Sequence, residues 1–296
     1  MTAVSRSMMT VSTSFVYKSV DISIAEHLSL QPDQVTGFLP FQSWFDRLQD
    51  SLSATPVKGG TKVEGTTPES FYRLKSIKVT DADYFGKAQA KLGFLKINAL
   101  VENDQGQSLP GIVFLRGSSA AMLVLVYPSD NPKANDPADY DDKNAMVVLT
   151  IQPRVAGATM SMVEIPAGMC DPSDVDHPGG ILTFTARREL EEECGICVEA
   201  HDMRPLYSSD TSAAKKGGIY MSGGACDELI QFFYCKKLMD KHEIEKLRAH
   251  SGGAAEEREK ITLRLIPLAD LVKETQDSKA IIAAALYSTL INIPSS

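Results

Sequence analysis

The sequence predicts an α/β protein of the α+β type, in which helices sandwich a mixed β-sheet. Many short apolar runs are bounded by turn residues, as strands are, and later segments repeat their apolar residues at helical spacing. These segments alternate without the regular spacing of βαβ units, which favours a mixed sheet over a purely parallel one. Hydrophobic residues make up 43% of the 296-residue chain, which is sufficient for a sizeable core.

The N-terminal region, residues 1–109, is expected to be the smaller of two parts. Its first twenty residues contain no acidic residue and many hydroxyl side chains, like a weak organellar transit segment, but a disordered start is the preferred interpretation. Within residues 37–52, Phe41, Trp44 and Phe45 recur at helical spacing and predict a short amphipathic helix. A linker rich in Gly, Thr and Lys follows.

The remaining elements are read from apolar runs and from helical periodicity. Strands are expected at 72–79, 92–103, 110–117, 120–128, 145–153, 229–235 and 261–268, and helices at 183–194, 268–276 and 278–291. Residues 129–144 are polar and predict a surface loop. We therefore expect the main domain to occupy residues 110–296.

Charge and cysteine content narrow the class of protein. The chain has 30 basic and 38 acidic residues, a net charge of −8, which argues against broad nucleic-acid binding. No apolar run approaches the length of a membrane span. The five cysteines, Cys194 and Cys197 included, are interpreted as free thiols in a reducing compartment rather than as a metal or redox pair. A cytoplasmic protein is expected, with an organellar location as the alternative.

The helix predicted at 183–194 carries the most informative residues. Glu189, Glu192 and Glu193 stand three and four residues apart, so they share one side of the helix. Like charges at this spacing destabilise an isolated helix, whereas converging carboxylates suit Mg²⁺ or Mn²⁺. Arg188, four residues before Glu192, could orient that carboxylate. A solvated acidic helix face is the alternative that these residues alone leave open.

The neighbouring residues favour the metal-binding interpretation. Residues 188–196, RELEEECGI, match every fixed position of Arg-Glu-aliphatic-x-Glu-Glu-x-Gly-aliphatic, the second half of the Nudix signature. The chain therefore resembles the Nudix hydrolases. The segments LGFLKINALVEN, LPGIVFLRG, QPRV, VEIPAGM, SGGACDE and EKITLRLIPL make it most similar to nucleotide-sugar diphosphatases of the plant ADP-sugar type.

The first half of the signature departs from the family pattern. Gly180 stands where the family has its first Glu. Gly168, the natural anchor, lies 20 residues before Arg188 rather than 14, which indicates an insertion of six residues in the intervening loop. This departure leaves the number of metal ions open.

The resemblance implies a role for particular residues of this chain. Glu189, Glu193 and the carbonyl of Ala167 would bind metal, and Glu192 and Arg188 would assist catalysis beside them. Substrate contacts are expected at Arg154, Glu164, Gly168, Gly224 and Glu228. The general base is expected at Glu259, in a loop before the last strand, with Glu256 and Glu257 as neighbouring alternatives.

The resemblance also implies the reaction and the assembly. The expected activity is Mg²⁺- or Mn²⁺-dependent hydrolysis of a nucleoside-diphosphate sugar to a nucleoside monophosphate and a sugar phosphate. A homodimer held partly by residues 70–110 is expected as well. Two alternatives remain: a Nudix hydrolase for nucleoside triphosphates or dinucleotide cofactors, and a Nudix-like domain that binds nucleotide without hydrolysing it.

Overall fold

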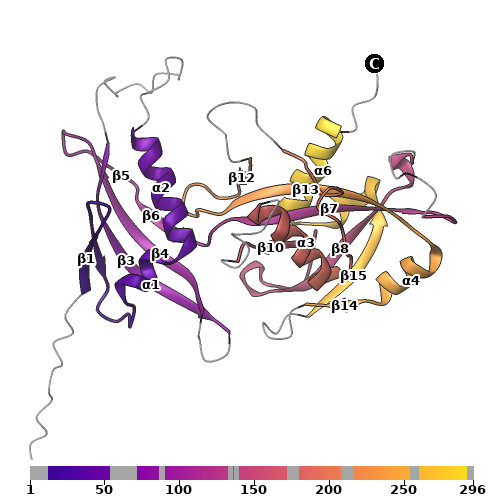
Figure 1. Cartoon of the computed structure of the whole chain (residues 1–296), viewed down its shortest axis with the longest axis horizontal. Helices are drawn as coiled ribbons and strands as arrows, with labels where there is room; N and C mark the ends of the chain where they lie inside the picture. The colour runs from indigo at the N-terminus through magenta and orange to yellow at the C-terminus, as the bar shows by residue number, and fades with distance from the viewer. Residues whose placement is uncertain are drawn as a thin grey trace, which may run out of the picture. The chain divides into compact units, whose positions relative to one another are not determined.

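The computed structural model describes residues 13–53, 72–86, 91–132, 136, 140–171, 180–207, 217–253 and 260–291. They form two compact units (Figure 1). The first consists of the described residues up to Gly117 together with Ser222–Glu228. The second consists of Ser118–Met221 and the chain from Leu229 onward. The predicted linker at 55–68 lies outside the described residues.

The first unit is a six-stranded sheet covered by helices on one face. Its strands are β1 (Thr13–Tyr17), β2 (Val20–Ile24), β3 (Arg73–Phe85), β4 (Lys91–Glu102), β5 (Ser108–Leu109) and β6 (Ile112–Leu115), and its helices are α1 (Pro32–Thr36) and α2 (Leu39–Ser53). The strand order is β1-β2-β3-β4-β5, with β6 also paired to β4. Phe41 and Phe45 of α2 are fully buried against Ile77 of β3 and Ile97 of β4, as the helical spacing predicts.

The beginning of the chain corrects one expectation. Residues 1–12 lie outside the described part, but β1 and β2 form an antiparallel hairpin, so the segment from Thr13 onward is ordered. Val20, Ile22 and Ile24 alternate inward and are at most 3% exposed. This alternation, rather than the hydroxyl-rich composition around it, determines the local structure.

The boundary between the units differs from the one expected after residue 109. Strand β6 pairs with β4, residue by residue from Ile112↔Asn98 to Leu115↔Leu95. It therefore belongs to the first sheet, and the first unit continues to Gly117.

The second unit contains a nine-stranded mixed sheet. Its strands are β7 (Ser119–Pro128), β8 (Met146–Arg154), β9 (Thr159–Glu164), β10 (Ala167–Met169), β11 (Arg204–Pro205), β12 (Ile219–Tyr220), β13 (Leu229–Met239), β14 (Ser251–Gly252) and β15 (Ile261–Pro267). The central order is β11-β13-β7-β8-β15-β14, and β9, β10 and β12 pair with β8, β7 and β13. Strand β13 runs parallel to β7 while the other pairs are antiparallel, which confirms the mixed sheet.

Helices cover both faces of this sheet. They are α3 (Ile181–Cys194), α4 (Lys241–Ala249), α5 (Leu271–Glu274) and α6 (Ser278–Leu286). On β7, Met122 and Val124 pack with residues of α3 and α4, and the alternate residues Leu123 and Leu125 pack with residues of α5 and α6. Since successive side chains of a strand point to opposite faces, β7 is buried on both sides and the predicted sandwich is confirmed.

The signature helix α3 begins and ends at glycines. Gly180 is its N-cap residue with φ +89°, and Gly195 is its C-cap residue with φ +66°. Both values lie in the left-handed region, which glycine adopts without strain. The sequence-predicted helix at 183–194 is confirmed, with a start two residues earlier. No described helix is both long enough and apolar enough to cross a lipid bilayer.

Candidate active site

The acidic side of α3 lies against the short strand β10 (Ala167–Met169). The backbone N–H of Ala167 donates a hydrogen bond to Oε2 of Glu193 at 3.2 Å, and Glu193 is only 3% exposed. A Cβ at Gly168 would lie 1.8 Å from Cδ of Glu189, so any other residue there would displace that carboxyl group. The structure thus brings together Glu189, Glu193, Ala167 and Gly168, which the sequence had placed in one site.

Arg188 links two of the carboxylates. Its Nη2 lies 3.0 Å from Oε1 of Glu189, and its Nη1 lies 3.0 Å from Oε2 of Glu192. The same guanidinium donates a hydrogen bond to the carbonyl of Met169 at 3.3 Å. The predicted contact with Glu192 is therefore present. The contact with Glu189 was not predicted, and it reduces the mutual repulsion of the two acids.

The donor chemistry of this site fits a divalent cation. Carboxylate oxygens are the ligands that Mg²⁺ prefers, and the missing Cβ of Gly168 lets Glu189 lie directly on the backbone of β10. Within the described ranges, no three His, Cys, Asp or Glu side chains already stand grouped as a metal cluster. The assignment of Glu189, Glu193 and the Ala167 carbonyl as ligands therefore stays a prediction.

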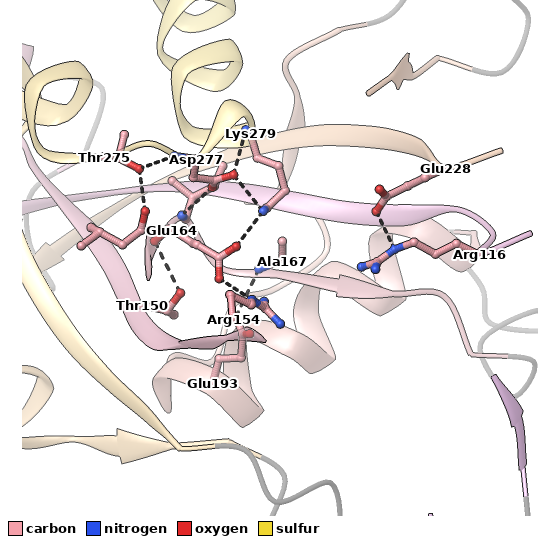
Figure 2. Close-up of polar contacts among 12 residues, drawn as sticks. Arg116, Thr150, Arg154, Glu164, Ala167, Glu193, Glu228, Thr275, Asp277 and Lys279 are labelled. Carbon is pink, nitrogen blue, oxygen red and sulfur yellow. Dashed lines mark hydrogen bonds and ion pairs between the residues drawn. The ribbon is translucent and has the colours of Figure 1, made fainter. Parts of the chain in front are cut away.

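Arg154 and Glu164 face each other across the β8–β9 hairpin (Figure 2). Nε of Arg154 donates to Oε2 of Glu164 at 2.7 Å. The Glu164 side chain is 8% exposed and the Arg154 side chain 40% exposed. The carboxylate is therefore an internal partner, and the guanidinium is the group of this pair that can meet a ligand.

Lys279 and Asp277 complete this network and were not predicted. Lys279 Nζ lies 3.1 Å from Oε1 of Glu164 and 2.9 Å from Oδ1 of Asp277. Burial lowers the pKa of Lys279, but the two carboxylates outweigh it and raise the pKa above its usual value. Asp277 is also the N-cap residue of α6, accepting from the N–H of Lys279. The acid-Ser-Lys sequence at a helix start could have indicated the cap, but nothing in it indicates Glu164.

The segment Ser222–Glu228 contains two of the expected substrate residues and belongs to the first unit. Glu228 accepts from Nε of Arg116 at 3.0 Å, while a Cβ at Gly224 would meet no atom within 4 Å. Asp227, which the sequence did not single out, accepts from the N–H groups of Arg116 and Gly117 at 2.7 and 3.0 Å. Its role is to hold that backbone turn. Burial raises the pKa of its carboxyl group.

The expected base, Glu259, lies outside the described residues together with Glu256 and Glu257. The residues just before them are fixed to the end of α3. Gly253 N–H donates to the carbonyl of Glu192 at 3.2 Å. A Cβ at Gly252 would lie 2.1 Å from the carbonyl oxygen of Glu193, so this contact requires glycine.

Two of the five cysteines, Cys194 and Cys235, are core residues. Cys194 and Cys235 are buried, and burial raises the pKa of both thiols, to about 12 for Cys235. Both pack among apolar residues of the core that contains Leu190. This environment suits a small apolar side chain rather than a reactive thiolate.

Comparison with known proteins identifies the class to which this fold and site belong. The chain is 33% identical to Nudix hydrolase 14, chloroplastic, of Arabidopsis thaliana over 244 residues, which cover 82% of this chain and 71% of that protein. The chain therefore belongs to the Nudix hydrolases, enzymes that hydrolyse nucleoside diphosphates linked to another group. No family model matches the chain. The crystal structure of an ADP compounds hydrolase matches 72% of this chain and 93% of its own at 15% identity, with a TM-score of 0.42.

Proposed function

We propose that this protein is a metal-dependent nucleoside-diphosphate-sugar diphosphatase. Its substrate would be of the ADP-ribose, ADP-glucose or UDP-glucose type, and its products a nucleoside monophosphate and a sugar phosphate. The observation that carries the proposal is the position of the Glu189 and Glu193 carboxylates against Ala167 and Gly168 of strand β10. That arrangement brings oxygen donors together beside a backbone that a diphosphate can approach closely.

The metal would be held by Glu189, Glu193 and the carbonyl of Ala167. A bound Mg²⁺ or Mn²⁺ supplies charge that offsets the diphosphate oxygens and lowers the pKa of an attacking water. Arg188 pairs with both Glu189 and Glu192 and so offsets the repulsion between them. Glu192 is the more exposed of these two acids, 45% against 15%, and lies at the edge of the site.

Arg154 would bind a phosphate oxygen of the substrate. Its guanidinium is held by Nε alone, and in the described part of the chain its two terminal nitrogens make no other polar contact. Two parallel N–H groups match the geometry of a phosphate. Gly224 and Glu228 are proposed as further substrate contacts, with Glu228 oriented by Arg116.

We assign the general base to Glu259. The signature carboxylates are committed to metal and to Arg188, so the proton of the attacking water needs another acceptor. Glu259→Gln should lower kcat by about 10²–10⁴-fold with little change in KM. Glu256→Gln and Glu257→Gln serve as matched controls in the same run. If Glu259→Gln keeps normal activity and one of the control variants loses it, the residue changed in that control is the general base.

A substrate panel tests the proposed reaction. The purified chain is incubated with ADP-ribose, ADP-glucose, UDP-glucose, NAD and ATP, with and without Mg²⁺, and the products are identified. Mg²⁺-dependent release of nucleoside monophosphate and sugar phosphate is the expected result. Preferred turnover of NAD or ATP would identify another Nudix activity. Tight binding without turnover of any compound would indicate a domain that only binds nucleotide.

The oligomeric state and the cellular compartment of the protein are proposed as well. We propose a homodimer, with a small nucleotide as the only other partner, and no association with nucleic acid or membrane. The composition favours the cytoplasm, and the chloroplastic relative supports the organellar alternative. A fluorescent fusion of the full chain in plant cells distinguishes the two compartments.

A further inference from the structure

Lys279 is placed where its charge can act on the substrate site through other side chains. It lies in the first turn of α6, and Figure 2 shows it reaching back to Glu164 and Asp277. Its side chain is 18% exposed, and both carboxylates lie within 3.1 Å of its ammonium group. An ammonium group with so little exposure to solvent is stable only when it is paired with a carboxylate.

The backbone around Glu164 is fixed to the same helix start. Oδ2 of Asp277 accepts from the N–H of Ile165 at 3.3 Å. The hydroxyl of Thr275 donates to the carbonyl of Val163. Residues on both sides of Glu164 are thus bound to the segment that leads into α6, so the position of Lys279 relative to the Glu164 carboxylate is well defined.

The charges of this network balance only when Lys279 is present. Glu164 and Asp277 are two acids at most 8% exposed at their side chains, and Arg154 and Lys279 are the two cations that face them. Without Lys279, Arg154 would be the one cation paired with Glu164, and Asp277 would have no partner of opposite charge among the described residues. The surplus negative charge would draw the guanidinium inward and repel an anionic ligand.

We propose that Lys279 is a positioning residue for the diphosphate of the substrate. By neutralising one side of Glu164, it lets that carboxylate hold Arg154 through Nε while both terminal nitrogens stay directed at a phosphate. The inference rests on the proposed function, because it assigns Arg154 to a phosphate group. Lys279 itself touches neither the substrate nor the reacting atoms.

A double-mutant cycle with ADP as the probe tests this inference. Titration calorimetry in Mg²⁺ compares the native chain, Lys279→Met, Arg154→Gln and the double variant. Lys279→Met should weaken ADP binding about tenfold, the size expected for loss of one charge-assisted contact. In the Arg154→Gln background the same substitution should change ADP binding less than about twofold, because Lys279 acts on the ligand only through Arg154.

Companion variants separate positioning from folding. Lys279→Arg keeps the charge and should bind ADP within about threefold of the native chain. Lys273→Met, on α5 with a side chain 75% exposed, is the matched control and should bind normally. Lys279→Gln replaces Lys279→Met if the latter does not fold, as judged by its thermal midpoint. With a substrate that is turned over, Lys279→Met should raise KM and leave kcat nearly unchanged.

The outcomes distinguish this inference from the proposed function. Normal ADP binding by a folded neutral variant would overturn the inference, and so would an equal loss in the Arg154→Gln background. Absence of ADP binding by the native chain would overturn it as well. An intact cycle together with no hydrolysis of the substrate panel would leave Lys279 as assigned and overturn the proposed reaction.

Discussion

At the scale of single residues, the site depends on glycines as well as on its charged side chains. A Cβ at Gly168 would displace the Glu189 carboxyl group, and a Cβ at Gly252 would collide with the backbone carbonyl of Glu193. Gly180 begins α3 with φ +89°, at the position where the family signature has a Glu. The departure from the signature thus falls on the N-cap of α3, more than two helical turns before Glu189 and Glu193 in the same helix.

Glu193 gives the sharpest test among these residues. Glu193→Gln should lower Mg²⁺-dependent turnover by at least about a hundredfold, because it keeps the shape of the side chain but removes a ligand charge. Its thermal midpoint should change little, because an amide oxygen can still accept from the N–H of Ala167.

Glu191→Gln is the matched control for that variant. Glu191 lies on the same helix but is exposed, and it occupies the variable position of the signature. It should retain native turnover. Near-native activity of Glu193→Gln would show that the carboxylate is no metal ligand, and an equal loss in both variants would point to a general effect of helix charge.

The sequence indicates candidate site residues one by one but not the contacts between them. Arg154 and Glu164 were each expected to meet substrate, and the structure adds a contact between them that was not predicted, with Glu164 buried. The pairing depends on the β8–β9 hairpin, whose second strand the sequence did not reveal. Lys279 is 115 residues from Glu164 along the chain, so no local pattern could join the two.

At the scale of elements, the long periodic segments were predictable and the short ones were not. Strands β7, β8, β13 and β15 and helices α2 and α3 carry sustained apolar patterns, and each lies where the sequence predicts it. Helix α4 was missed, because only Ile244 and Leu247 of its nine residues are buried and the others are mostly charged. Strands of two or three residues, such as β10, depend on partners brought close by the rest of the fold.

The polar loop at 129–144 contains an unexpected anchor. Asp142 accepts hydrogen bonds from the hydroxyls of Tyr127 and Tyr287, and it pairs with Nζ of Lys236 at 2.9 Å. Its partners come from β7, from the π-helical segment Tyr287–Ile291 that follows α6, and from β13, so one carboxylate joins three elements. Burial raises the pKa of Asp142, but these three partners outweigh it and hold the pKa below its usual value.

Asp142→Asn should therefore lower the free energy of unfolding by about 1–3 kcal/mol at pH 7. A carboxyl group whose folded pKa is depressed stabilises the fold above its unfolded pKa of about 4, and that contribution is lost as pH falls toward the folded value. The difference between native and variant should be constant from pH 5 to 7 and shrink below about pH 4.

Urea unfolding followed by circular dichroism at several pH values measures this difference. Asp130→Asn is the control, since Asp130 lies in the same loop and is exposed. A difference that stays unchanged down to pH 3 would mean that the hydrogen bonds of the two tyrosines, rather than the carboxylate charge, account for the stabilisation.

At the scale of the whole molecule, the proposed dimer depends on which face of the first sheet leaves apolar side chains exposed. The apolar residues of β3 and β4 were expected to require a partner, but most of them are buried within their own unit. Leu95, Ile97 and Ala99 of β4 are at most 4% exposed and share a core with α2. These strands are therefore covered on one face within their own unit, and a dimer would use the opposite face of the sheet.

That opposite face retains apolar side chains. Ile112 is 61% exposed, and Leu100 and Phe85 are each 39% exposed. The rings of Phe85, Phe94 and Phe114 form a continuous series. The ring centroids of Phe85 and Phe94 are 4.8 Å apart, and those of Phe94 and Phe114 are 4.9 Å apart. Exposed apolar side chains that cluster in this way mark a protein–protein contact more often than scattered ones do. A second copy of the chain is the occupant we propose.

Sedimentation equilibrium at micromolar concentration should show a dimer, and Ile112→Asp should weaken it. In a two-fold dimer the substitution acts twice, and losing about 1.5 kcal/mol of apolar burial per copy raises the dissociation constant about a hundredfold. Val155→Asp is the control, because Val155 is 88% exposed but lies in the second unit. A native chain that sediments as a monomer would refute the dimer. A dimer equally weakened by both substitutions would place the contact elsewhere, because Val155 does not belong to the sheet face that contains Ile112.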